Sequence, residues 1–406
     1  MRILIVTHGF PPKEVTGTEQ HSYILARELM KNHEVHVFSR GEGKECQEHV
    51  ESHDKIPISR INTPKMSSRI KFQDTYLDNH VAEIFSARLE EFRPDVIHVQ
   101  HCIALGFSLL ETAIKRNIPI LLFLHDFFFM CHNINLIKSD GERCTGPKNE
   151  KYCMQCISTY GPSLNKIDSQ EIGIKKYQYV NEILCKIDCI ASPSQFVKEV
   201  FVRNFPSISE IIVAPLGLDL SFLKKFARKK TGKFIFGYLG AVGPHKGVHV
   251  LIEAFKNLKM KNVELRIHGG GEVKYQEEIQ QIANKDIIFF GPYLHDRLAE
   301  ILSEIDVLVL PSLCNESYSF TIREALAAGI PVITSNLRSQ ADAIKEEHNG
   351  LHYENENTSD LKIKMELIVK DKQLYQKLSE NAIRTHITSI HEQVKQLEDL
   401  YHKISH

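Results

Sequence analysis

The stretch PSLCNESYSFTIREALAAGIPVIT, residues 311–334, decides the fold class of this chain. It follows the apolar run Val307–Leu310, which reads as a buried strand. Phe320–Ala328 reads as a helix that a glycine and a proline end, and Val332–Thr334 reads as the next strand. A strand, a helix and another strand in so short a stretch indicate a βαβ unit with parallel strands.

The same alternation runs along the chain in two series. The first series has expected strands at Ile3–Thr7, Val35–Phe38, Val96–Val99, Ile120–Leu124 and Cys189–Ser192. The second has them at Ile235–Leu239, Val263–Ile267, Ile287–Phe289, Val307–Leu310 and Val332–Thr334. A chain of 406 residues suits two cores of ordinary size. We therefore predict an α/β protein with two Rossmann-like, doubly wound parallel-sheet domains.

We place the N-terminal domain at residues 1–205, with a cysteine-rich insertion at 126–165, and the C-terminal domain at residues 206–385. Residues 386–406 form a further expected helix with an apolar stripe at Leu397, Leu400, Tyr401 and Ile404. We expect this helix to pack back on the N-terminal domain.

Charge and hydropathy narrow the class of protein. The net charge is −1, so the balance of charges predicts no nucleic-acid partner. The first residues read as a buried strand rather than a signal peptide, and the apolar run Ile118–Met130 is shorter than the roughly 20 residues of a spanning helix. We expect a cytoplasmic protein and leave open a peripheral contact with the inner face of the membrane.

Two carboxylates flank the start of the expected helix, eight positions apart. Glu316 lies on a loop and Glu324 in the first turns of the helix. A carboxylate can accept two hydrogen bonds from a ribose diol, and a helix N-terminus offers free N–H groups to a diphosphate. By itself the pair also fits a helix start with a capping carboxylate.

The wider sequence resembles the retaining glycosyltransferases of the GT-B fold that carry a Glu-x(7)-Glu motif, glycosyltransferase family 4, group 1. The segments that carry the resemblance follow in the family's order along nearly the whole chain: HGFPPKEVTGTEQHSYILARELMKNHEVHVFS (8–39), SPSQFVKEVF (192–201), LGAVGPHKGVHVLIEAF (239–255), RIHGGGE (266–272), IIFFGPY (287–293), LVLPSLCNESYSFTIREALAAGIPVIT (308–334) and NGL (349–351). The resemblance implies an acceptor-side N-terminal domain and a nucleotide-sugar-binding C-terminal domain that face each other across a cleft.

The resemblance also implies roles for individual residues of the C-terminal domain. Glu324 is expected to hold the nucleotide ribose and Glu316 the hydroxyls of the donor sugar. The backbone at Ser319 and Phe320 is expected to approach the diphosphate. Lys246 matches the family's diphosphate-binding lysine, a point charge for the leaving group.

Further donor-site residues are implied around these. His125, at the end of an expected strand, is expected to face the donor sugar, and it joins Glu316 and Lys246 as a predicted catalytic residue. Gly17, Thr18 and, in RIHGGGE, Gly271 are expected to line the nucleotide-sugar site, because glycine lets the backbone approach a ligand closely.

The chain departs from the family at two positions. Ala241 stands where an arginine commonly helps the lysine bind the diphosphate, and Thr18 stands where a second glycine is common. Arg323 is a candidate substitute for the missing arginine. These departures weaken the case for catalysis at the diphosphate end.

The function implied is transfer of a hexose-like sugar from a nucleoside-diphosphate sugar to an acceptor hydroxyl with retention, in polysaccharide or glycoconjugate synthesis. The acceptor class stays open among glycan, lipid-linked and small-molecule acceptors, and no catalytic metal is expected. Three alternatives remain: a non-catalytic nucleotide- or glycan-binding partner subunit, a sugar-nucleotide epimerase, and an NAD-linked oxidoreductase. The sequence has no strand-linked G-x-G-x-x-G, which counts against the oxidoreductase.

Four of the nine cysteines lie in the insertion, at Cys131, Cys144, Cys153 and Cys156. Four thiolates at this density suit a tetrahedral structural zinc, with no open position for catalysis. Free thiols and labile disulfides are the alternatives, because the spacing is not that of a standard zinc finger.

Overall fold

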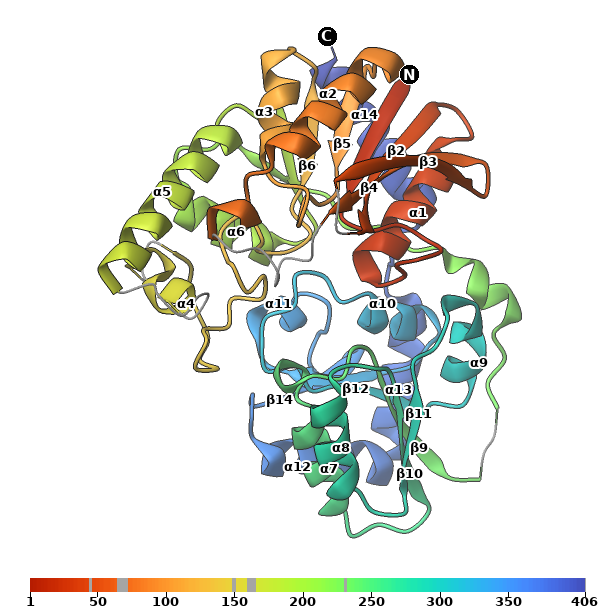
Figure 1. Ribbon diagram of the computed structural model, residues 1–406. Helices are drawn as coiled ribbons and strands as arrows, with labels where there is room; N and C mark the ends of the chain where they lie inside the picture. Colours follow the sequence, from red (N-terminus) through yellow and green to blue (C-terminus); the bar gives the residue numbers. More distant parts are fainter. Residues whose placement is uncertain (44–45, 64–71, 148–150, 159–165, 230–231, 406) are drawn as a thin grey trace. The chain divides into compact units, whose positions relative to one another are not determined.

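The computed structural model describes residues 1–43, 46–63, 72–147, 151–158, 166–229 and 232–405. The chain divides into two units (Figure 1). The first consists of Met1–Gly217 and Thr388–His406, and the second of Leu218–Ile387. Both are parallel-sheet α/β units, so the predicted fold class is confirmed.

The first unit is built on an eight-stranded sheet in the order β3-β4-β2-β1-β5-β6-β7-β8. The strands are β1 (Arg2–Thr7), β2 (Glu34–Glu42), β3 (Gln47–His53), β4 (Ile56–Thr63), β5 (Val96–Val99), β6 (Ile120–Phe123), β7 (Cys189–Ser192) and β8 (Ile211–Val213). The edge strand β3 pairs antiparallel with β4, and the other pairs are parallel. Because β8 pairs with β7, the first unit extends past the expected boundary at residue 205 to Gly217.

Helices cover the two faces of this sheet. They are α1 (Gly17–Leu29), α2 (Asn79–Phe92), α3 (Ser108–Lys115), α5 (Lys166–Leu184), α6 (Gln195–Asn204) and α14 (Ile390–Ile404). The short helix α4 (Met154–Ser158) packs against α5, and η2 (Phe72–Thr75) and η3 (Lys151–Cys153) are short turns. Alternate residues of β1 enter different cores, as the two-residue period of a strand requires. Ile3 and Ile5 pack with α1 and α14, whereas Leu4 and Val6 pack with α2 and α3.

Helix α14 supplies part of the first unit's core although it comes last in the chain. Leu397 and Tyr401 are fully buried in the cluster that contains Ile24 and Leu25 of α1. The chain leaves this unit at Gly217, whose N–H donates to Gln393 Oε1 of α14 at 2.8 Å. The exit and return of the chain therefore lie side by side.

The second unit has a six-stranded parallel sheet in the order β11-β10-β9-β12-β13-β14. Its strands are β9 (Phe234–Leu239), β10 (Val263–His268), β11 (Ile287–Gly291), β12 (Val307–Leu310), β13 (Val332–Ser335) and β14 (Gly350–Tyr353). Its helices are α7 (Val248–Lys256), α8 (Val273–Gln281), α9 (Leu298–Ser303), α10 (Phe320–Ala327), α11 (Arg338–Ala341), α12 (Thr358–Lys370) and α13 (Lys372–Arg384), with η4 (Leu220–Lys225), η5 (Pro244–Lys246) and η6 (His295–Arg297).

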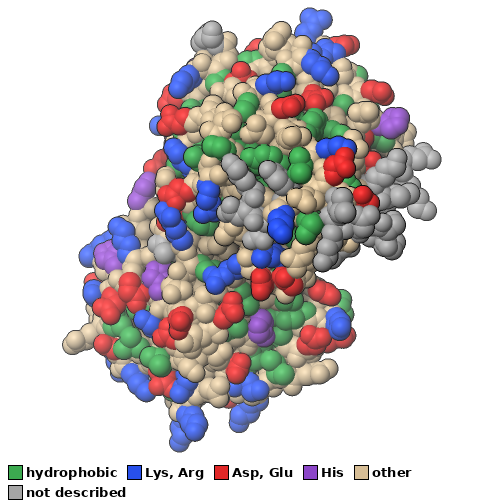
Figure 2. All heavy atoms as spheres, turned by 90° about the vertical axis from the view of Figure 1, so that its left-hand side faces the viewer, with side chains coloured by type: hydrophobic (Ala, Val, Ile, Leu, Met, Phe, Trp, Pro, Cys, Tyr) green, Lys and Arg blue, Asp and Glu red, His purple; other side chains and the backbone are tan. Residues whose placement is uncertain are grey.

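The surface matches the near-neutral net charge. On the face drawn in Figure 2, acidic and basic side chains are interspersed over the described residues. Among those residues, the structure contains no helix that is both long and apolar enough to cross a membrane.

Truncation of Leu397 tests the packing of α14. We expect Leu397→Ala to lower the stability of the first unit by about 2–5 kcal/mol, because a buried leucine leaves a cavity when it is shortened. Hydrogen exchange of β1 and α1 should accelerate, whereas exchange in the second unit should not change. Lys395→Ala on the exposed face of the same helix is the control. Equal effects of the two substitutions would contradict the assigned packing.

Candidate active site

The strand order of the second sheet reverses between β9 and β12, and ligands bind at such a switch point in doubly wound folds. Lys246 ends η5, just after β9, and Glu316 lies on the loop after β12. The structure brings these two predicted residues together, with 2.8 Å between Lys246 Nζ and Glu316 Oε1. A charged pair therefore stands at the carboxyl ends of the two strands that flank the switch point.

Both members of this pair carry a charge. Burial alone would raise the pKa of Glu316, but the ammonium of Lys246 and the hydroxyl of Ser312 outweigh it, so the pKa lies below its ordinary value. Burial likewise opposes the charge of Lys246, and the carboxylate of Glu316 raises the pKa of the lysine above its ordinary value. The Ser312 hydroxyl donates to the same carboxylate oxygen at 2.6 Å.

The start of α10 lies on the same loop. Ser319 is the N-cap residue, and its Oγ accepts a hydrogen bond from the N–H of Ile322 at 3.5 Å. Phe320 is the first residue of the helix, so the expected phosphate-binding backbone is at a true helix N-terminus. Glu324 is buried in the second turn, and His295 Nε2 lies 3.2 Å from its Oε1.

Arg323, the candidate substitute for the arginine missing at Ala241, is bound to residues of its own loop. Its Nη1 donates to the carbonyl of Ser319 at 3.0 Å, and its guanidinium lies 3.5 Å from the centroid of the Tyr318 ring. Ala241 itself is exposed. Arg323 is therefore held by its own loop, and Lys246 is the basic residue that the structure places next to Glu316.

Gly271 joins two loops at the same edge of the sheet. It forms a bridge with Val242, and a Cβ atom on Gly271 would lie 1.8 Å from the Val242 carbonyl oxygen. Only glycine permits this approach. The loops after β9 and β10 are thus fixed against each other next to Lys246.

His125 follows β6 in the first unit and is buried. Its Nε2 hydrogen-bonds Gln100 Oε1, and the Gln100 amide donates to His98 Nε2 at 2.7 Å. His98 Nδ1 in turn contacts the hydroxyl of Tyr401 in α14. Burial, followed by the neighbouring histidines, holds the pKa of His125 well below its ordinary value. His125 is therefore a neutral, oriented imidazole and not a cation.

Gly17 and Thr18 are the first residues of α1, after β1. The first sheet also has its switch point at this strand, between β1 and β5. The next residue, Glu19, pairs with His8 at 3.1 Å. Burial opposes the charge of Glu19, but its contact with His8 lowers its pKa to about 2.

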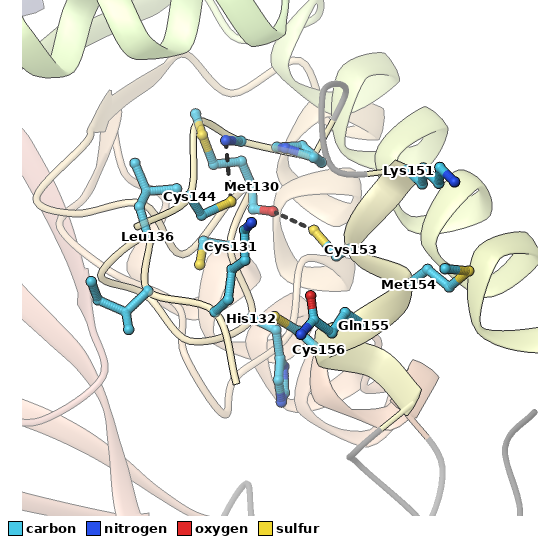
Figure 3. A pocket seen from close by; sticks show the side chains of 14 residues that line it. Met130, Cys131, His132, Leu136, Cys144, Lys151, Cys153, Met154, Gln155 and Cys156 are labelled. Atoms are coloured by element: carbon cyan, nitrogen blue, oxygen red, sulfur yellow. Dashed lines mark hydrogen bonds between the residues drawn. The ribbon is translucent and has the colours of Figure 1, made fainter. Parts of the chain in front are cut away.

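The four predicted zinc ligands line one cavity of the first unit (Figure 3). Cys131, Cys144, Cys153 and Cys156 surround a space of about 170 Å³. Among the described residues, no three His, Cys, Asp or Glu side chains stand close enough together to hold a metal ion as they are.

Sequence reasoning missed the partners of the predicted residues: Ser312 beside Glu316, His295 beside Glu324 and Gln100 beside His125. Each of the three follows a strand at its carboxyl end. That position was the available signal, but which polar groups meet there depends on the order of strands in the sheet.

Comparison with known proteins agrees with this architecture. Residues 15–222 match the family described as Glycosyltransferase Family 4, and residues 221–385 match Glycosyl transferases group 1. The chain belongs to these glycosyltransferases, as its sequence predicted.

Individual relatives are distant. A putative glycosyltransferase of Bacillus subtilis, YtcC, is 28% identical over 52% of this chain, which spans 58% of that relative. A glycogen synthase of Mycobacterium tuberculosis is 24% identical, over 86% of this chain and 82% of its own. The crystal structure of Anabaena Alr3699/HepE in complex with UDP and glucose has a TM-score of 0.70 at 15% identity, covering 98% of both chains. This structural likeness supports the GT-B fold.

The pair of His295 and Glu324 predicts a pH dependence of stability. The hydrogen bond to Glu324 raises the pKa of His295 above 6.5. The stability from this pair is therefore fully present below pH 6.5 and is lost as the pH rises through the raised pKa. Chemical denaturation should show that His295→Ala destabilises the protein at the acid end of this range and less at the alkaline end.

The matched control places the same substitution in a Glu324→Gln background. There the pH dependence of the effect of His295→Ala should shrink, because Glu324 is the largest cause of the raised pKa of His295. An undiminished pH dependence in this background would show that another group causes it.

Proposed function

We propose that the protein transfers a sugar from a nucleoside-diphosphate sugar to an acceptor hydroxyl with retention of anomeric configuration, in the synthesis of a polysaccharide or glycoconjugate. The observation that carries the proposal is the ion pair between Lys246 and Glu316 at the switch point of the second sheet. Membership of the glycosyltransferase family supports it, as does the fold shared with a protein crystallised with UDP and glucose.

In this proposal the nucleotide binds along the start of α10. Glu324 accepts hydrogen bonds from the ribose diol, with His295 holding one of its oxygens. The backbone N–H groups at Ser319 and Phe320 bind the diphosphate, which the partial positive charge of the helix N-terminus favours. Gly271 keeps the neighbouring loop close without a side chain in the way.

Lys246 supplies the charge for the leaving group. In the structure its ammonium is neutralised by Glu316. A bound diphosphate adds negative charge beside the lysine, and this charge grows as the bond to the sugar breaks. Lys246 then shares its charge with the phosphate, and a carboxylate oxygen of Glu316 becomes available to the sugar hydroxyls. The proposal assigns these roles to Lys246 and α10 rather than to a divalent ion.

Retention follows if the departing phosphate oxygen takes the proton of the acceptor hydroxyl on the same face of the sugar. A hydrolase would instead use a carboxylic acid and a second carboxylate around the bond. Here Glu316 is assigned to the sugar hydroxyls and no pair of carboxyl groups is assigned to the bond, so the protein contributes positioning and electrostatics. Neutral His125 uses its Nε2–H on Gln100, so its Nδ1 can accept a hydrogen bond from a hydroxyl of the donor sugar without adding charge.

A donor screen tests the proposal. The full chain is incubated with nucleoside-diphosphate sugars and a panel of glycan, lipid-linked and small-molecule acceptors, and products are identified by mass spectrometry. Nuclear magnetic resonance of the product then reports the anomeric configuration. Inversion would contradict the retaining mechanism, and a changed sugar nucleotide without acceptor would indicate an epimerase. Binding of NAD alone would indicate an oxidoreductase.

Removal of the charged pair should abolish most of the activity. We expect Lys246→Met to lower kcat by about 10²–10³-fold, the typical loss when one group that stabilises transition-state charge is removed. Glu316→Gln should lower kcat as well, since it removes the carboxylate charge that pairs with Lys246 and strengthens the hydrogen bonds to the donor sugar. Glu253→Gln on α7 serves as a control in the same unit. Unchanged glycan output in cells that carry Glu316→Ala or His125→Ala would favour the non-catalytic subunit.

Restoring the family's arginine tests the departure at Ala241. This residue is exposed, so Ala241→Arg can be accommodated. One charge-assisted hydrogen bond contributes about 1.5–3 kcal/mol, so we expect nucleoside diphosphate to bind roughly tenfold or more tightly. Calorimetric titration measures this, with Ala241→Gln as the uncharged control. An unchanged Kd for Ala241→Arg would mean that the diphosphate does not lie beside this loop.

A further inference from the structure

Four cysteines from three separate segments meet in the insertion between β6 and α5. Cys131 follows the turn of Phe127–Met130, Cys144 follows the bridge between Ile137 and Arg143, and Cys153 and Cys156 lie in η3 and α4. Their side chains line one cavity (Figure 3). Nothing in the proposed glycosyl transfer uses this cavity.

The insertion has little regular structure to hold it in place. Beyond one isolated bridge, its described part contains the three-residue η3 and the five-residue α4. Ile134, Leu136 and Cys153 have φ values of 69°, 57° and 64°, in the left-handed region. A β-branched residue such as Ile134 rarely adopts this conformation unless its surroundings impose it. The loops therefore need a restraint beyond their own local preferences.

Backbone and amide N–H groups are already directed at two of the sulfur atoms. The N–H of Gly146 donates to Cys144 Sγ at 3.3 Å, and Asn133 Nδ2 donates to Cys156 Sγ at 3.7 Å. Gly146 has a φ of 114°, and a Cβ atom there would lie 2.2 Å from the side chain of Asn204, so this turn is fixed. Such donors favour the negatively charged form of a sulfur ligand.

A buried lysine lies beside the same thiols. The side chain of Lys176 in α5 is buried, and its Nζ lies 5.6 Å from the centroid of the Phe72 ring. Lys176 lines a second small cavity together with Cys153. No carboxylate of the described chain forms an ion pair with it, although a buried ammonium needs a compensating negative charge. A four-thiolate centre that holds a divalent ion has a net charge of −2 and would supply it.

We propose that Cys131, Cys144, Cys153 and Cys156 bind one structural zinc ion. Zinc prefers four tetrahedral ligands of this kind at about 2.3 Å, and four protein ligands leave no position for substrate. The sulfur atoms must move inward across the cavity of about 170 Å³, because they are not yet within ligand distance. Each thiol loses its proton on binding, so the ion replaces four protons.

The ion would tie the insertion to the segment that carries His125. Cys131 N–H donates to the carbonyl of Phe127 at 2.6 Å, and Phe128 N–H donates to Asp126 Oδ1 at 2.8 Å. His125 directly precedes these residues in the chain. The role of the zinc is therefore structural, and it is independent of whether the second unit binds a nucleotide sugar.

The first experiment needs no variant. The full chain is purified under reducing conditions without added metal, and its metal content is measured by inductively coupled plasma mass spectrometry. We expect one zinc per chain, released in step with titration of thiols by a mercurial reagent. If the purified protein contains no zinc, it is titrated with Co²⁺. We then expect thiolate-to-cobalt charge-transfer absorption. The proposal would be overturned if the protein bound neither zinc nor cobalt. It would also be overturned if these four cysteines formed disulfides in protein kept under reducing conditions.

Variants then identify the ligands. Cys131→Ser, Cys144→Ser, Cys153→Ser and Cys156→Ser should each lose zinc, whereas Cys156→His should retain it because histidine is also a zinc ligand. Asn133→Ala should weaken zinc binding by about 10–100-fold, as expected for a group that hydrogen-bonds a ligand. Hydrogen exchange of the second unit shows whether each variant is otherwise folded.

Two controls lie close to the site. Cys185→Ser removes an exposed cysteine on the same unit, and His132→Ala removes a histidine that lines the same cavity. Both should keep one zinc per chain. Retention of zinc by the four serine variants, or its loss in Cys185→Ser, would overturn the assignment of ligands.

Discussion

A parallel sheet collects the carboxyl ends of all its strands at one edge, and the chemistry of the second unit depends on this constraint. Residues from the loops after β9, β10 and β12 are distant in sequence, yet they meet at that edge. The reversal of strand order between β9 and β12 leaves their two loops free to diverge, which opens a place for a ligand. Lys246 lies on the loop after β9 and Glu316 on the loop after β12, and their side chains meet at this switch point.

Because Lys246 and Glu316 form an ion pair, a ligand that binds to Lys246 must compete with Glu316 for it. Two half-buried charges are tolerated because they neutralise each other, and removing one partner would leave the other uncompensated. A dianionic diphosphate can take the lysine's charge only if the carboxylate finds new hydrogen-bond donors. In the proposed function the sugar hydroxyls are such donors, so a ligand that brings both a phosphate and a sugar would suit the pair. Arg323 cannot take part in this exchange while it rests on Tyr318 and Ser319.

The sequence predicts an element well when neighbouring residues alone determine its structure. Buried parallel strands such as β6, β7 and β12 read as continuous apolar runs, and they were predicted within one residue of their observed bounds. The hairpin of β3 and β4 was missed, because its turn is built on Asp54 and Lys55, which adopt positive φ without a glycine to announce it.

The site residues divide in the same way. Motif segments pointed to Lys246, Glu316 and Glu324, but the hydrogen bonds to Ser312 and His295 exist only once strands from distant parts of the chain are adjacent. The chain of hydrogen bonds from Tyr401 through His98 and Gln100 to His125 joins residues up to 303 positions apart, and no local pattern reports it. The four cysteines were grouped by sequence, whereas the buried Lys176 beside them became visible only in the fold.

The return of α14 to the first unit has a consequence for how the protein is made. The ribosome completes Met1–Gly217 early, but Leu397 and Tyr401 arrive only after the whole second unit has been synthesised. At about 5–20 residues per second, these roughly 180 residues take about 9–36 seconds. Throughout that time the face of the sheet that carries Ile3 and Ile5 lacks its last covering helix, and His98 lacks the hydroxyl of Tyr401. The nascent chain thus exposes an apolar surface for chaperones to cover, and the surroundings of His125 are completed last.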